Sequence, residues 1–169
     1  LTIISWGLRK INSLIKAFWL ICLLKHGPQI LPKSFFLLTL ASTLSFLISC
    51  TINSLSAALT ELIFVITITS TMLLFLGHEL RLIQTLTAVM GSSVIVGVVV
   101  VCVLAINPAP NLLVRLSIFF WNLSILANIL RHSLGIHYFQ AGLLSIVYAF
   151  TLNQLVIVVE NYFTQPNLN

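Results

Sequence analysis

Residues 94–106 read VIVGVVVVCVLAI, an apolar run in which no side chain carries a charge. With residues 83–93 before it, the run exceeds the about 20 residues that a helix needs to cross the hydrocarbon core of a bilayer. Its side chains do not alternate between apolar and polar, as those in the strands of a membrane barrel would. The stretch therefore predicts a transmembrane α-helix.

Apolar runs of similar length occur at four other places, over residues 34–50, 59–76, 112–130 and 139–159. Of the 169 residues, 59% are hydrophobic and 7% are charged, and the mean hydropathy is +1.13. A soluble domain must cover its surface with polar groups, which this composition does not supply. Because backbone polar groups must be satisfied within lipid, we predict an all-α polytopic membrane protein with a bundle of five transmembrane helices.

Residues 1–26 have an amphipathic helical pattern. Ile4, Leu8 and Ile11 recur at three- and four-residue steps, whereas Arg9 and Lys16 lie on another face. A lysine or arginine at the centre of a spanning helix costs about 2.5–3.5 kcal/mol. We therefore predict a helix over residues 3–24 that lies in the headgroup layer, in preference to a partial sixth span. The side chains expected at the membrane surface are Arg9, Lys10, Lys16, Trp6 and Trp19.

Proline and glycine separate this helix from the bundle. Gly27 and Pro28 end the helical pattern and Pro32 prevents its continuation, which predicts a linker over residues 27–33. The bundle then covers residues 34–160, and a polar tail follows over residues 161–169. Glu61 is expected to open the second span, near a helix N-terminus, where the helix dipole favours a carboxylate.

The basic residues orient the bundle. Five of the eight lie before the first apolar run, and with five spans Arg81 and Arg131 fall on the same side of the membrane. Only Arg115 falls on the other side, so the positive-inside rule predicts a cytoplasmic N-terminus. The net charge of +5 is concentrated at this end of the chain. It favours the anionic lipids of the inner leaflet as a partner over nucleic acid.

Small and amide side chains mark the expected helix-packing sites. Gly91 and Ser92 should let a neighbouring span approach the third span closely, while Gly97, six residues on, faces elsewhere. Asn122 and Asn128 are expected to form hydrogen bonds between helices inside the bundle.

Asn153 and Gln154 are further amides expected inside the bundle. A second interpretation of all four amides is a polar lining for a lipid or quinone headgroup. Cys22, Cys50 and Cys102 lie in apolar surroundings without CxxC spacing, so we expect buried, inert thiols.

A polar cluster is expected at the cytoplasmic ends of the spans. Its members are His78, Glu79, Arg81, Arg131 and His132. One interpretation is an ion pair between Glu79 and Arg81 that gates an entrance, and the other is a set of solvated loop charges. The histidine spacing matches no metal motif, so we predict neither a metal nor another cofactor.

Recognisable catalytic groups are missing from the sequence. It contains no HExxH, no GxSxG and no phosphate-cradling glycine loop. Glu61, Glu79 and Glu160 all lie near the ends of spans, which argues against a proton-coupled transporter. We therefore predict no catalytic residue.

Three stretches together resemble the Yip-like domain of the Ypt-interacting protein superfamily. They are GPQILP at residues 27–32, RLIQTL at residues 81–86, and Trp121 followed by ILRHSLG at residues 129–135. The resemblance implies a small bacterial membrane protein with five spans and a cytoplasmic N-terminus. The family offers no catalytic motif to carry over.

The function predicted from these observations is that of a non-enzymatic accessory or scaffold protein of a bacterial inner membrane. It would bind another integral membrane protein, or form a homo-oligomer, through its spans. The alternative is a small transporter or a lipid- or quinone-handling protein with a cavity between the spans. An enzyme ranks last.

Overall fold

The computed structural model describes the backbone of residues 2–164 and the side chains of residues 12–163. In this part of the chain the secondary structure is helical. The six helices are α1 (Thr2–Cys22), α2 (Phe35–Ile52), α3 (Leu55–Phe75), α4 (Leu82–Ile106), α5 (Leu112–Leu134) and α6 (Tyr138–Thr164). Two short 3₁₀ turns, η1 (Pro28–Ile30) and η2 (Glu79–Arg81), precede α2 and α4.

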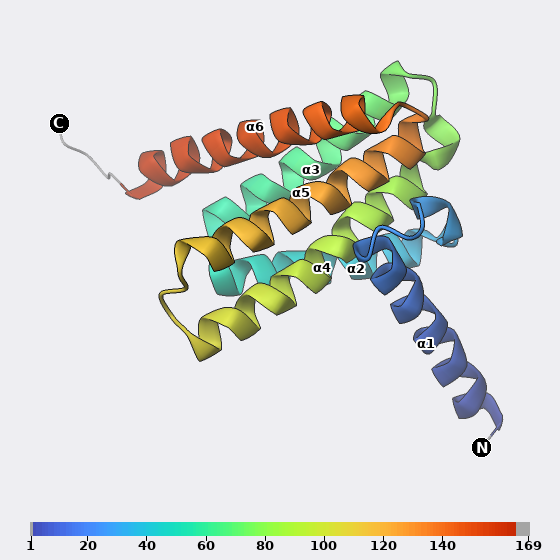
Figure 1. The fold of residues 1–169 in the computed structure, drawn as a ribbon. Coiled ribbons are helices and arrows are strands. Elements are labelled where there is room, and N and C mark those ends of the chain that lie inside the picture. The colour runs from blue at the N-terminus through green and yellow to red at the C-terminus, as the bar shows by residue number, and fades with distance from the viewer. Residues whose placement is uncertain (1, 165–169) are drawn as a thin grey trace.

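The helices α2 to α6 are each long and apolar enough to cross a membrane, which confirms the predicted fold class. They run alternately up and down, and α4 packs against α1, α2, α3 and α5 (Figure 1). One end of the bundle holds Lys33, Arg81 and Arg131 and is called the basic end below. The opposite end holds the turn at Asn53 and the loop of residues 107–111.

Two predicted boundaries are wrong. The third helix starts at Leu55 because the hydroxyl of Ser54 caps it, accepting a hydrogen bond from the Ala57 amide at 3.3 Å. Glu61 consequently lies in the second turn of α3 and does not open the span. The last helix continues to Thr164, into the predicted polar tail, because nothing between Glu160 and Thr164 stops a helix.

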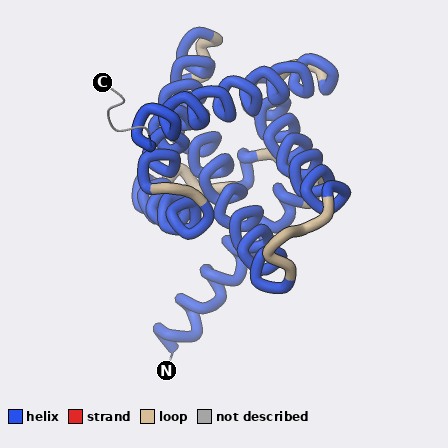
Figure 2. The backbone as a smooth tube through the Cα atoms, turned by 90° about the vertical axis from the view of Figure 1, so that its left-hand side faces the viewer, coloured by secondary structure: helices blue, strands red, loops and turns tan. Residues whose placement is uncertain are grey.

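The axis of the first helix, α1, lies at a steep angle to the five long helices instead of parallel to them (Figure 1). In Figures 1 and 2, α1 projects sideways from the five long helices, and only its C-terminal part touches them.

The helix α1 ends in a Schellman motif just before the linker. The amide of Lys25 bonds to the Leu20 carbonyl at 3.0 Å and that of Leu24 to Ile21 at 2.9 Å. Leu24 has φ of 62°, a left-handed conformation that glycine usually adopts at this position. The helix therefore stops at Cys22, two residues before the predicted end.

Candidate functional site

Two side chains of α5 hold the C-terminal end of α1. The indole of Trp121 donates to the Cys22 carbonyl at 3.1 Å, and the amide of Asn128 donates to the His26 carbonyl at 3.1 Å. Asn128 is buried, as are Ile21 and Cys22. The last carbonyls of a helix lack partners within the helix, so Trp121 supplies a donor that α1 needs, and Asn128 holds the segment that follows α1. Burial also raises the pKa of the Cys22 thiol to about 11. The other two cysteines, expected to be buried, are half-buried at Cys50 and exposed at Cys102.

Gly91 lies in contact with α1. A Cβ atom placed on Gly91 would overlap the ring of Phe18, so the ring rests directly on the α4 backbone. The prediction that Gly91 meets a neighbouring span is therefore wrong, because the crossing helix α1 occupies that face. Gly97 faces the α2 side chain of Ile48, and a Cβ there would lie 2.5 Å from its Cγ2 atom. Ser92 is buried and donates to the Val89 carbonyl of its own helix.

The residues of the polar cluster lie at the basic end. In the part of the chain that the structure describes, Glu79 and Arg81 do not form an ion pair with each other. Arg81 instead donates from Nη1 to the carbonyls of His132 and Ser133, at 3.2 and 3.4 Å. These carbonyls belong to the last turn of α5, where a cation is favoured by the helix dipole. Arg81 thus caps the C-terminal end of α5.

The remaining members of this cluster have separate positions. The guanidinium of Arg131 lies 5.6 Å from the centre of the Tyr138 ring. His132 packs against Gly27 of the linker, where an added Cβ would lie 2.6 Å from the histidine Cβ. His78 and Glu79 are in the α3–α4 connection, and Glu79 is exposed. Within residues 12–163, no three His, Cys, Asp or Glu side chains lie close enough to hold one metal ion.

The predicted membrane-surface residues are described only in part. Lys16 and Trp19 are exposed on α1, and 49% of the Trp19 surface is accessible. The side chains of Trp6, Arg9 and Lys10 lie outside the described residues.

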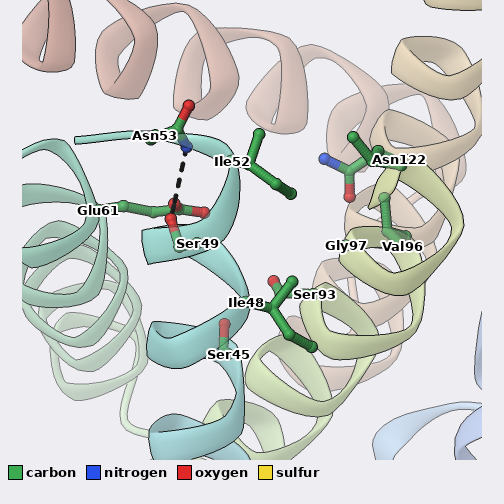
Figure 3. Close-up of a pocket in the computed structure, with 11 residues that line it drawn as sticks. Ser45, Ile48, Ser49, Ile52, Asn53, Glu61, Ser93, Val96, Gly97 and Asn122 are labelled. Carbon is green, nitrogen blue, oxygen red and sulfur yellow. Dashed lines mark hydrogen bonds between the residues drawn. The ribbon is translucent and has the colours of Figure 1, made fainter. Parts of the chain in front are cut away.

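A polar cavity of about 180 Å³ opens between α2, α3, α4 and α5 at the end opposite the basic end (Figure 3). The carboxylate of Glu61 is the charged group in its lining. Ser49 donates to Glu61 Oε2 at 2.6 Å, and Asn53 donates to Ser49 Oγ at 3.4 Å. Asn122 reaches the cavity from α5, and Ser93 from α4. The sequence analysis placed Glu61 at the end of a span and did not predict this cavity. The signal in the sequence was that Ser49 and Glu61 flank one tight turn, which brings their two helices side by side.

The amides of α6 have a different environment from the one predicted. Asn153 and Gln154 are both exposed on the outer surface of the bundle, not inside it. Neither side chain forms a hydrogen bond to another described residue. The reason is that α6 packs mainly on α3 and α5 through its other side, which includes the buried residues Ala141, Ser145 and Tyr148.

No family model, no curated protein and no solved structure matches this chain.

Proposed function

We propose that this chain is a non-enzymatic accessory protein of a bacterial inner membrane that binds another membrane-spanning protein, or a second copy of itself, through α6. The observation that carries this proposal is the exposed amide pair Asn153 and Gln154. Asn153 lies seven residues before Glu160, a rise of about 10 Å along the helix. Both amides therefore lie well within the length of a membrane span.

An amide facing hydrocarbon without a partner is costly. Moving such a group from water into a medium that cannot hydrogen-bond costs about 4–8 kcal/mol. A facing helix that offers an amide, hydroxyl or carbonyl satisfies these groups, with each hydrogen bond contributing about 0.6 kcal/mol on average and at most about 1.7. Paired amides also fix the register of two helices.

The surface around the amides suits a helical partner. Val147, Phe150, Ile157 and Val158 are exposed on the same helix, with 43–64% of each side chain accessible. Lipid chains are as apolar as these side chains, so the apolar side chains alone do not favour a partner helix over lipid. The amides supply the specific contact and the apolar residues supply packing.

The orientation and location belong to the same proposal. The basic end would face the cytoplasm, since Lys33, Arg81 and Arg131 gather there. The crossing helix α1, with Lys16 exposed, would lie on anionic lipid of the inner leaflet. The resemblance to the Yip-like domain supports five spans and a cytoplasmic N-terminus.

A double substitution tests the proposal. The variant Asn153→Leu with Gln154→Leu removes both amides and keeps α6 apolar, while Ile157→Leu on the same surface serves as the matched control. We expect the wild-type protein and the control to be recovered in mild detergent as a complex or oligomer, with a mass measured by light scattering and native mass spectrometry. The double variant should be monomeric. Equal complex formation by the double variant and the control would refute the role of α6.

A further inference from the structure

We infer that the cavity around Glu61 binds a small molecule or lipid headgroup that carries a primary ammonium group. This inference is independent of the proposed role of α6. It rests on the position of one carboxylate, on the acceptors that surround it and on the shape of the cavity (Figure 3).

The carboxylate is set inside the bundle instead of on its surface. Glu61 is six residues from the start of α3, which places it about 9 Å along the helix. It is partly buried, and Ser49, which donates to it at 2.6 Å, is buried with 8% of its surface accessible. The lining of the cavity contains no Lys, Arg or His to balance the charge. A cation in the cavity would provide that balance.

The other polar groups add acceptors for an N–H donor. Ser93 directs its own proton to the Val89 carbonyl at 3.0 Å, so its oxygen lone pairs remain available. Ser45 and Asn122 contribute further oxygens to the lining. An ammonium group has three N–H donors and no acceptor, which matches a carboxylate surrounded by hydroxyl and amide oxygens.

The size and the apolar walls favour an organic cation over a bare metal ion. The cavity volume of about 180 Å³ is several times the roughly 30 Å³ that one water occupies in the liquid. Ile48, Ile52, Val96 and Val100 form apolar parts of the wall, suited to the methylene groups of a short amine. One carboxylate also matches one positive charge.

Ligands would enter from the end opposite the basic end. Asn53 and Asn122 line the cavity and are both exposed, and Asn53 is the C-terminal cap of α2. Asn53 therefore lies at the membrane surface, whereas Asn122 is ten residues into α5, about 15 Å along that helix. The cavity thus reaches the surface at Asn53 and extends inward to Asn122. The ammonium group can therefore come from a free amine in water or from a phosphatidylethanolamine headgroup in the leaflet on that side.

Ethanolamine is the probe for the free-amine source. With the full chain in phosphatidylcholine nanodiscs, isothermal titration should show saturable binding of ethanolamine and none of ethylene glycol, which replaces the ammonium by a hydroxyl. Glu61→Gln should weaken binding at least tenfold. Glu160→Gln, which alters a carboxylate at the same end but outside the cavity lining, should leave binding unchanged.

Native mass spectrometry tests the headgroup source. After reconstitution in mixed phosphatidylethanolamine and phosphatidylcholine, the wild-type protein should retain phosphatidylethanolamine selectively and Glu61→Gln should not. Either ligand source supports the inference if it depends on Glu61. Absence of both, or binding that Glu61→Gln leaves unchanged, overturns it.

A second variant guards against misfolding. Asn122 is exposed and forms no hydrogen bond to another described residue, so Asn122→Leu should fold normally. If Glu61→Gln loses its cooperative thermal transition, ethanolamine binding is measured with Asn122→Leu in its place. A severalfold loss of ammonium binding supports the inference, and wild-type binding refutes it.

Discussion

The ring of Phe18 on α1 lies directly on the backbone of Gly91, so no α4 side chain separates this ring from the central helix α4. Such close approach needs a residue without a Cβ atom. This contact sets how closely α1 can approach α4. It leads to the first prediction.

Replacing Gly91 by leucine should push α1 away from α4. The added side chain has no space beside Phe18, and overpacking of this kind costs about 1–3 kcal/mol or more. We expect a lower melting temperature in detergent. Val98→Leu on the same helix is the control, because 48% of Val98 is accessible and its surface is open. Equal melting of the two variants would show that α1 does not depend on this contact.

Cys22 should be nearly inert toward maleimide while α1 remains docked. Its thiol is buried, and its pKa is raised from 9.0 to about 11, so at pH 8 the thiolate fraction falls about a hundredfold. Reactivity should increase as the pH rises toward 11. Labelling of a protein with Cys50→Ser and Cys102→Ser, before and after unfolding in detergent, measures this. Gly91→Leu should expose the thiol; rapid labelling of the parent protein at pH 8 would contradict the docked position of α1.

Leu24→Gly should stabilise the protein by about 0.5–1 kcal/mol. Leu24 has φ of 62°, which costs an L-residue about 1–2 kcal/mol, and part of the gain is offset by the greater unfolded-state freedom of glycine. Leu23→Gly is the matched control, since Leu23 is comparably exposed but has no positive φ. The control should destabilise the protein. Denaturation curves that rank the two variants in the opposite order would rule out the left-handed cap.

Arg81→Gln should destabilise the basic end. It removes the charged donor to the carbonyls of His132 and Ser133, and the expected loss is about 1–2 kcal/mol for a partly exposed site. Arg115→Gln changes the charge equally, but Arg115 bonds only to the nearby Pro110 carbonyl at 3.1 Å among the described residues. Thermal melts of the two variants should therefore differ. A loss at Arg115 as large as that at Arg81 would indicate a general charge effect.

The proposed topology places Asn111 and Arg131 on opposite sides of the membrane. In a background without the native cysteines, a cysteine introduced at each position should react with an impermeant maleimide from one side only. Position 131 should be reached from the cytoplasm and position 111 from the outside. Labelling of both from the same side would exclude five spans.

Sequence alone determined the number of spans. Runs such as residues 94–106 are recognised because the free energy of moving a helix into lipid is a sum over neighbouring residues and needs no tertiary contact. The helix N-caps also depend only on nearby residues. The hydroxyls of Ser34 and Ser54 each accept a hydrogen bond from the backbone amide three residues later. The helix ends were predicted less accurately, since α6 continues to Thr164, four residues into the predicted tail.

Tertiary structure decided which way each side chain faces. Asn128 is buried against the His26 carbonyl, whereas Asn153 and Gln154, of the same chemical type, face outward. Polar side chains are few in the spans and do not gather on one face, so the hydropathy pattern does not show which face packs inward. Their rotation depends on packing and on hydrogen bonds of about 0.6 kcal/mol each, which a single sequence does not reveal. The same holds for Glu61, whose contact with Ser49 arises only when α2 and α3 fold against each other.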